Sequence, residues 1–146
     1  MITEHPPKNF NPDIETASCI LKHNGKIIIL HRQDHKPQGN TWGSPTGKID
    51  KNETPLKTIS REVKEETGID IPENEFKFYK SYYVEYPDLR FIYHLFSCEI
   101  NQAPQIIIRN NEHKNFKWVT PEQALNMPLI QDFDSVIKDF FNINKK

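Results

Sequence analysis

A single segment near the middle of the sequence carries signals for both the beginning and the end of a helix. Thr54 can accept a hydrogen bond from the first-turn N–H groups, and Pro55 has the fixed φ that suits the first helical position. Gly68 allows the left-handed conformation that ends many helices, so we expect this helix to run to about Thr67. At about 100° per residue its apolar side chains form one stripe, which has to be buried against another element. The stripe consists of Leu56, Ile59 and Val63.

The segments on both sides of this helix have the composition of β-strands. Residues 15–23 and 26–32 are separated by Asn24-Gly25, a dipeptide that accepts the positive φ values of a two-residue hairpin turn. Further strands are predicted at residues 75–86, 90–100 and 116–119, and further helices at residues 121–126 and 132–141. This order of elements predicts an α/β (α+β) fold in which helices cover the faces of a mixed β-sheet.

Length and charge restrict the domain organisation and the partners. The 146 residues suit one domain, which we place at residues 14–146 behind an extended, partly loose N-terminal arm at residues 1–13. The formal net charge of −1 argues against a strongly basic surface for duplex nucleic acid. No apolar run approaches the roughly 20 residues of a membrane helix, and the N-terminal segment lacks a signal-peptide core. We therefore expect a cytoplasmic protein in which Cys19 and Cys98 are reduced, packed thiols.

Three carboxylates lie on the face of the predicted helix next to its apolar stripe. Glu62, Glu65 and Glu66 are spaced i, i+3 and i+4, and each like-charged pair with Glu62 costs about 0.2–0.5 kcal/mol on an exposed helix. In a partly desolvated cleft, two such charges roughly 4 Å apart cost about 4 kcal/mol. A bound divalent cation removes that penalty, and the all-oxygen ligand set favours Mg²⁺ or Mn²⁺ over zinc. The alternative interpretation is a solvated acidic face that binds no ion.

The residues around this acidic face follow a longer spaced pattern. It runs Gly47, five residues, Glu53, seven residues, Arg61-Glu62-Val63, one residue, Glu65-Glu66, one residue, Gly68-Ile69. At about one chance in fifteen per fixed position, seven matches have a chance on the order of 10⁻⁸ at a given start. The pattern resembles the Nudix box of the Nudix hydrolases. The resemblance implies an α/β/α sandwich in which residues 47–69 form a loop, a helix and a loop, and it implies hydrolysis of nucleoside diphosphate derivatives.

The resemblance also implies roles for individual residues of the box. The implied ligands of the divalent ion, Mg²⁺ with Mn²⁺ as a substitute, are the backbone carbonyl of Gly47 and the carboxylates of Glu62, Glu65 and Glu66. In the family Arg61 steadies the glutamates rather than touching the substrate. Its guanidinium can bind a carboxylate through two parallel hydrogen bonds, and we expect that carboxylate to be Glu53.

Outside the box, the sequence is similar to the MutT-like nucleoside triphosphate pyrophosphohydrolases. Glu112, six residues before Trp118, lies where that branch often has a further glutamate, so it is a candidate metal ligand and general base. Glu65 or Glu66 remains open as the base instead. The catalytic candidates are thus Glu53, Arg61, Glu65 and Glu112, and the substrate-binding candidates are Arg32, Lys48 and Gln131. Thr46 departs from this branch, which usually has a second glycine there.

These features predict Mg²⁺-dependent hydrolysis of a nucleoside triphosphate, standard or oxidised, to a nucleoside monophosphate and pyrophosphate. Dinucleoside polyphosphates, nucleoside diphosphate sugars and RNA 5′ ends stay open as substrates. A Nudix-fold sensor, which binds a nucleotide without cutting it, is the second class, and the complete set of box acids argues against it. The expected partner is a small-molecule nucleotide, and a homodimer stays open because dimers are common in the family.

Overall fold

The computed structural model describes residues 1–102 and 104–144, so residues 103 and 145–146 of the predicted domain lie outside the described part of the chain. The strands are β1 (Ile2–Thr3), β2 (Ile14–His23), β3 (Lys26–Arg32), β4 (Trp42–Gly43), β5 (Thr46–Lys48), β6 (Lys77–Tyr86), β7 (Leu89–Glu99) and β8 (His113–Val119). The helices are α1 (Pro55–Thr67), the 3₁₀ helix η1 (Glu73–Glu75), α2 (Pro121–Ala124) and α3 (Phe133–Phe141). Among the described residues, no helix combines the length and the apolar character needed to cross a membrane.

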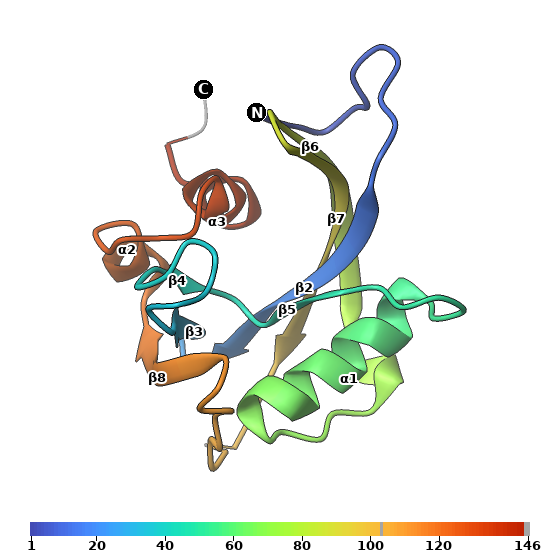
Figure 1. Cartoon of the computed structure of the whole chain (residues 1–146). Helices are drawn as coiled ribbons and strands as arrows, with labels where there is room; N and C mark the ends of the chain where they lie inside the picture. Colours follow the sequence, from blue (N-terminus) through green and yellow to red (C-terminus); the bar gives the residue numbers. More distant parts are fainter. Residues whose placement is uncertain (103, 145–146) are drawn as a thin grey trace.

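The strands form one mixed sheet, as the sequence predicts. Its order is β1-β6-β7-β2-β3-β4, while β5 pairs with β2 and β8 pairs with β3. β2 and β7 are parallel, from the pair Ile14–Phe91 to the pair Lys22–Glu99, and the other strand pairs are antiparallel. In Figure 1, α1 lies on one face of this sheet, and α2 and α3 lie on the other. The fold is therefore the α/β/α sandwich that the resemblance implies.

Two apolar cores, one on each face of the sheet, hold these layers together. Alternate side chains of β2 and β3 point to opposite faces, since successive residues of a strand do so. The core under α1 contains Leu21, Ile28, Leu30, Ile59 and Val63. The core under α3 contains Ile20, Ile27, Ile29, Val136 and Ile137. Each of these side chains is at most 2% exposed, and full burial of such a side chain contributes about 1.5–3 kcal/mol.

Helix α1 begins and ends at the predicted residues. The Thr54 side chain accepts a hydrogen bond from the N–H of Lys57 at 3.2 Å, and Pro55 is the first helical residue. At the other end Gly68 has φ 80°, and its N–H donates to the carbonyl oxygen of Lys64 at 2.9 Å. The predicted stripe is also confirmed, because Ile59 and Val63 are fully buried and Leu56 packs against the same core.

The hairpin between β2 and β3 positions the functional region. Asn24 and Gly25 have φ values of 51° and 75°, so the predicted turn is confirmed. The two strands pair with each other only beside this turn. Farther along, β2 pairs with β5 and β7, whereas β3 pairs with β4 and β8. Residues 42–48 therefore pass from the edge of β3 to the edge of β2, and this crossing carries the residues of the site that precede α1.

Several predicted bounds are wrong by a few residues. Strand β6 begins at Lys77 rather than at residue 75, because residues 73–75 form the single turn of η1. Strand β8 begins at His113 rather than at residue 116, because its pairing with β3 extends to Arg32. Helix α2 ends at Ala124, two residues early.

The predicted N-terminal arm begins with an extended segment. Ile2 and Thr3 form β1 and pair with Val84 and Tyr83 of β6. The ring of Phe10 then packs edge-on against that of Tyr83, with 5.5 Å between the ring centroids. The arm is therefore held along the outer edge of the sheet.

The two cysteines are free and buried, as the sequence predicts. Burial raises the pKa of the Cys19 thiol well above its usual value, and it raises the pKa of Cys98 as well. A thiol with a raised pKa is a weak nucleophile, so both side chains act as small apolar residues of the core.

Candidate active site

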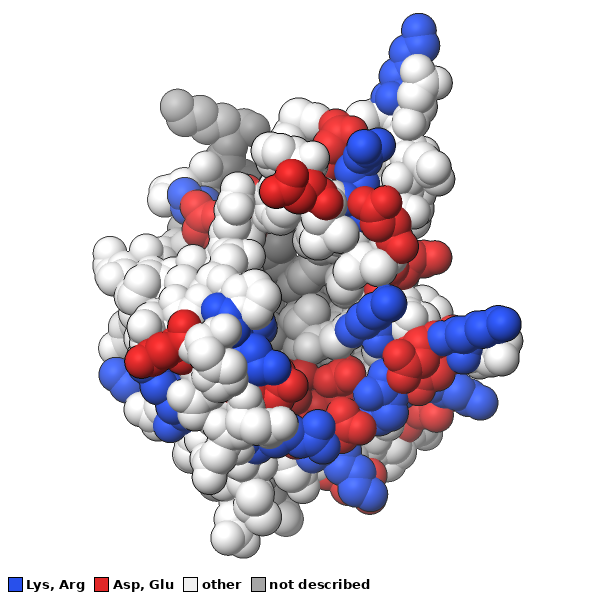
Figure 2. Space-filling model, viewed as in Figure 1, with Lys and Arg blue, Asp and Glu red and all other residues white. Residues whose placement is uncertain are grey.

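Helix α1, strand β5 and the loop before β8 enclose an acidic cavity of about 250 Å³. Figure 2 shows acidic side chains gathered at the edge of a hollow, with lysine and arginine side chains around them. The cavity brings together the predicted metal ligands and the predicted substrate residue Lys48. Its lining residues are Thr46, Gly47, Lys48, Glu62, Glu65, Glu66, Arg109 and Glu112.

Arg61 holds the carboxylates around this cavity in place. Its Nε and Nη2 donate to the two carboxylate oxygens of Glu53, both at 2.9 Å, which is the predicted bidentate contact. Its Nη1 donates to Glu62 Oε1 at 2.7 Å and lies 3.4 Å from Glu65 Oε2. One guanidinium thus ties the loop before α1 to two acidic side chains of the helix. Since neither Arg61 nor Glu53 lines the acidic cavity, both position the residues that do.

Glu53 remains ionised over most of the accessible pH range. The two hydrogen bonds from Arg61 hold the pKa of this carboxyl at about 2, and the backbone N–H of Asp50 and the hydroxyl of Thr58 add further donors. The same contacts raise the pKa of the Arg61 guanidinium above its already high value. Glu53 and Arg61 therefore stay charged and form a structural ion pair, and neither exchanges a proton during the reaction.

Glu66 is the most buried acid of the cavity, with 7% of its surface exposed. Burial raises its pKa well above that of an ordinary glutamate, and the neighbouring Glu62 raises it further. The backbone N–H of Thr46 donates to Glu66 Oε1 at 3.4 Å and partly offsets this effect. A buried carboxylate beside a second carboxylate is stabilised by a proton or by a cation.

Gly47 has no side chain because Glu62 occupies the space where one would be. A Cβ built on Gly47 would overlap Cγ, Cδ and Oε1 of Glu62. The backbone of Gly47 has no positive φ, so the requirement for glycine here is close approach rather than backbone conformation. The backbone of Gly47 and the carboxylate of Glu62 therefore lie against each other in the wall of the acidic cavity.

The donor set of the cavity fits a hard divalent cation. Carboxylate and backbone oxygens are the ligands that Mg²⁺ and Mn²⁺ prefer. Within residues 1–102 and 104–144, no three His, Cys, Asp or Glu side chains are already arranged around a common metal position. Instead, basic side chains pair with the acids: Arg61 with Glu62 and Glu65, Arg109 with Glu65, and Lys36 with Glu112. The repulsion between Glu62 and Glu66 is what a cation would remove.

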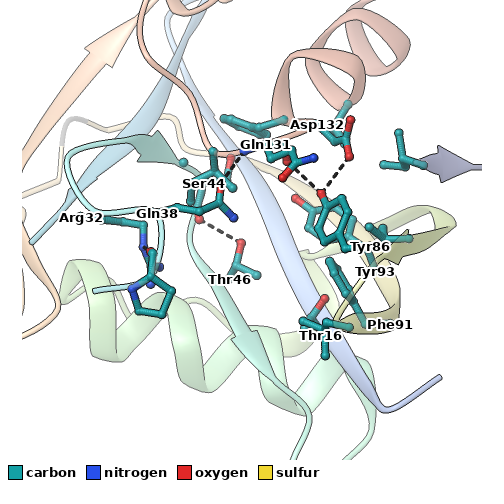
Figure 3. A pocket seen from close by; sticks show the side chains of 18 of the residues that line it. Thr16, Arg32, Gln38, Ser44, Thr46, Tyr86, Phe91, Tyr93, Gln131 and Asp132 are labelled. Atoms are coloured by element: carbon teal, nitrogen blue, oxygen red, sulfur yellow. Dashed lines mark hydrogen bonds between the residues drawn. The ribbon is translucent and has the colours of Figure 1, made fainter. Parts of the chain in front are cut away.

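A larger cavity of about 380 Å³ adjoins the acidic one. The two share Thr46, Glu66 and Glu112. In Figure 3, β6 and β7 form an aromatic wall with Tyr86, Phe91 and Tyr93, and the Tyr86 hydroxyl donates to Asp132 Oδ2 at the start of α3 at 2.8 Å. The predicted substrate residues Arg32 and Gln131 both line this larger cavity, on the side of β3 and on the side of α3. The site therefore consists of an acidic cavity next to a mostly apolar one.

Arg109 and His113, which line the cavities, and Lys36, which contacts the cavity residue Glu112, were not found by sequence reasoning. Arg109 Nη1 lies 3.9 Å from Glu65 Oε2, and Lys36 Nζ lies 3.3 Å from Glu112 Oε1. His113 lines the larger cavity with 5% of its surface exposed, and burial lowers its pKa to about 4. All three are at loops or strand ends, where no helical or strand periodicity marks them. The only available signal was the adjacency of His113 to Glu112.

The comparison with known proteins agrees with this fold. A family model described as the NUDIX domain matches residues 13–140. The dihydroneopterin triphosphate diphosphatase of Haemophilus influenzae is 33% identical over 138 residues, which cover 85% of this chain and 84% of that protein. The CTP pyrophosphohydrolase of Escherichia coli is 28% identical over 116 residues, 80% of this chain and 82% of that protein. The solved structure of a MutT protein from Methanosarcina mazei superposes with a TM-score of 0.78 at 24% identity, covering 93% of this chain and 98% of that chain.

The chain belongs to the Nudix hydrolase family. It is a Nudix pyrophosphohydrolase that acts on nucleotide derivatives. Nudix hydrolases generally use divalent metal ions, in agreement with the oxygen-rich donor set of the acidic cavity.

Proposed function

We propose that this enzyme hydrolyses a nucleoside triphosphate between its α- and β-phosphates with Mg²⁺, and releases a nucleoside monophosphate and pyrophosphate. The observation that carries the proposal is that the acidic cavity and the aromatic cavity adjoin and share the lining residues Thr46, Glu66 and Glu112. A substrate whose ring occupies the aromatic cavity extends its phosphate chain into the acidic one. Two relatives support this choice, because their names give CTP and dihydroneopterin triphosphate, both triphosphates, as the compounds they cleave.

The size of the larger cavity favours a substrate with a single ring system. Its volume of about 380 Å³ is near the lower end of the roughly 300–1,000 Å³ typical of small-molecule pockets. A dinucleoside polyphosphate would have to leave its second nucleoside outside this cavity. A nucleoside triphosphate has one ring system for the larger cavity and one phosphate chain for the acidic cavity.

In this proposal the divalent ion is held by oxygen atoms of α1, of β5 and of the loop before β8. The proposed ligands are the carbonyl of Gly47 and the carboxylates of Glu62, Glu65, Glu66 and Glu112. When bound, the ion neutralises phosphate oxygens and lowers the pKa of a coordinated water. The pairing of Arg61 with Glu53 keeps the acidic face of α1 in one orientation while this happens.

Basic residues in the cavities and beside them bind the phosphate chain in this proposal. Arg109 and Lys36 are each paired with an acid that the cation would engage, so each is free to bind a phosphate oxygen once the cation is present. Lys48 lines the acidic cavity, and Arg32 lines the adjoining one. Their positive charges offset the repulsion between the phosphates and the acidic lining, which is the main electrostatic requirement of phosphoryl transfer.

Glu112 is the proposed acceptor of the proton from the attacking water. Its side chain is 37% exposed, so it can exchange protons with solvent, whereas Glu66 is almost fully buried. It also lines both cavities, next to the point where the α-phosphate of the substrate would lie. Glu65, at 33% side-chain exposure, is the alternative acceptor.

The test is product analysis combined with a conservative substitution. We expect the wild-type enzyme with Mg²⁺ to convert a nucleoside triphosphate to the monophosphate and pyrophosphate, and Glu65→Gln to lower kcat at least 100-fold, because it removes a negative charge where the cation binds. The matched control is Glu73→Gln, on the exposed surface of η1, which should leave kcat unchanged. Release of nucleoside diphosphate and phosphate, or an unchanged kcat for Glu65→Gln, would contradict the proposal.

A further inference from the structure

The side chain of Gln38 connects two walls of the larger cavity. Gln38 lies in the loop after β3, Gln131 lies just before α3, and both residues line the cavity. The backbone N–H of Gln131 donates to Gln38 Oε1 at 2.7 Å, although the two residues are 93 positions apart in the sequence. In Figure 3 the Gln38 side chain lies across the cavity from Tyr86. The hydrogen bond therefore ties two distant loops together beside the place proposed for the substrate ring.

This contact determines the orientation of the Gln38 amide. A backbone N–H can only donate, so the amide atom that faces the N–H of Gln131 has to be the oxygen. The amide nitrogen, Nε2, is then turned away from Gln131, and it donates to no residue within 1–102 and 104–144. Gln38 is exposed, so a bound molecule can reach this nitrogen. The cavity wall thus carries an NH₂ group that donates only and whose direction is set by the backbone of another loop.

Neighbouring polar side chains of the cavity differ from Gln38 in this respect. The Tyr86 hydroxyl donates to Asp132 Oδ2 at 2.8 Å, so its proton is already used. The hydrogen bonds of Gln131 to the described residues involve its backbone, so its side-chain amide can rotate and present either the oxygen or the nitrogen. An amide that rotates binds a carbonyl group or an amino group equally well. The fixed amide of Gln38 distinguishes between them.

The loop that carries Gln38 is held on both sides of this residue. Arg32 Nε donates to the carbonyl oxygen of Pro37 at 2.9 Å, and the hydroxyl of Thr41 donates to the carbonyl oxygen of Gln38 at 2.6 Å. Gln38 itself has φ 53°, a left-handed conformation that is unfavourable for a residue with a Cβ. Residues kept in such a conformation in a cavity wall are often functional. The backbone of Gln38 is therefore fixed as well as its amide.

We propose that Gln38 Nε2 donates a hydrogen bond to an exocyclic carbonyl oxygen of the substrate ring, and that the enzyme therefore prefers keto rings to amino rings. This inference rests on the proposed function, because it places the ring of the same triphosphate in the larger cavity. Hypoxanthine and uracil carry an oxygen where adenine and cytosine carry an amino group. An amino group at that place would face the NH₂ of Gln38, so two donors would meet and neither would have a partner once water is removed. A site of this kind discriminates against the ring that cannot accept.

The experiment exchanges an oxygen for an amino group at one ring position. For wild type, Gln38→Glu and Gln38→Met, kcat/KM is measured with ITP and ATP and with UTP and CTP, and the pair that the wild type cleaves faster decides the test. We expect the wild type to prefer the keto nucleotide about tenfold, the factor that corresponds to about 1.4 kcal/mol.

The two variants change the amide in different ways. Gln38→Glu keeps an oxygen for the N–H of Gln131 and replaces the donor by an acceptor, so it should reverse the preference in favour of the amino nucleotide. Gln38→Met has neither group and should bring the ratio of the two kcat/KM values close to one. The matched control is Gln105→Glu, the same change at an exposed residue that lines neither cavity, and it should leave the ratio unchanged.

The outcomes separate this inference from the proposed function. A wild type without preference for the keto nucleotide, or the same ratio in wild type and Gln38→Glu, would overturn the role of Gln38. If the wild type cleaved none of the four triphosphates, the proposed function would fail, and calorimetric binding of IMP, AMP, UMP and CMP would then decide the inference alone. Tighter binding of the keto monophosphate to the wild type and of the amino monophosphate to Gln38→Glu supports the inference, and an equal preference in the two proteins refutes it.

Discussion

Replacing Gly47 by alanine tests the geometry of the acidic cavity with a single methyl group. The added Cβ would overlap three atoms of the Glu62 side chain, whereas carbon atoms normally pack about 3.5–4.0 Å apart. The carboxylate of Glu62 would therefore have to move by about 1 Å or more, and a displacement of that size at a reacting centre costs about 100-fold in rate. We expect kcat/KM to fall by that factor, equivalent to about 2.7 kcal/mol of transition-state stabilisation, and the Mg²⁺ concentration for half-maximal activity to rise.

The matched control for this variant is Gly25→Ala in the hairpin turn. A Cβ on Gly25 meets no atom within 4 Å, but the φ of 75° makes alanine unfavourable there by about 1–2 kcal/mol. Steady-state kinetics and urea denaturation should thus give opposite results: Gly47→Ala loses activity and little stability, and Gly25→Ala loses stability and no activity. Combining Gly47→Ala with Glu62→Gln should cost less than the sum of the two single effects, because both act on one carboxylate. Full activity of Gly47→Ala at limiting Mg²⁺ would refute the reasoning.

Two further predictions concern the buried side of the molecule. Val63→Asp should destabilise the fold by more than about 4 kcal/mol, because it replaces a fully buried side chain of α1 by a carboxyl without a partner. Thermal unfolding followed by circular dichroism compares this variant with Lys64→Asp, a change at an exposed residue of the same helix. Equal melting temperatures for the two variants would show that α1 is oriented differently. For His113, burial lowers the pKa from 6.5 to about 4, so the unfolded chain binds a proton that the folded chain does not as the pH falls through this interval. When the pH is lowered from 7 to 4, the free energy of unfolding of the wild type should therefore fall by up to about 3 kcal/mol more than that of His113→Leu. Urea denaturation without metal ions measures this free energy at each pH. Equal pH dependence of the unfolding free energy in the two proteins would contradict the prediction.

The features that sequence reasoning predicted correctly are mostly set by residues near one another in the chain. The ends of α1 depend on Thr54 and Gly68, which act on backbone groups within their own turn of helix. The contact between Arg61 and Glu53 spans eight residues across one loop and one helix, and the resemblance to the Nudix box was sufficient to predict it. The turn at Gly25 is equally local.

The features that were missed depend on contacts between distant segments. Lys36 reaches Glu112 across 76 positions, and the start of β8 at His113 depends on its pairing with Arg32 of β3. Gln38 is an ordinary glutamine in the sequence, and its contact with the backbone of Gln131, 93 positions away, distinguishes it. Such residues carry no periodic signal, because their environment is created by tertiary structure.

The parallel pairing of β2 with β7 has a consequence for how the chain acquires its structure. Residues 14–22 form the middle of the sheet, yet their partners are residues 91–99, more than half the chain away. Closing so large a loop is slow in comparison with forming a hairpin, because the entropy is lost before the contacts are gained. During synthesis the central strand thus has to remain without its parallel neighbour until residue 99 has left the ribosome. Fragments that stop before β7 should stay unfolded and expose the Ile- and Leu-rich strands to aggregation.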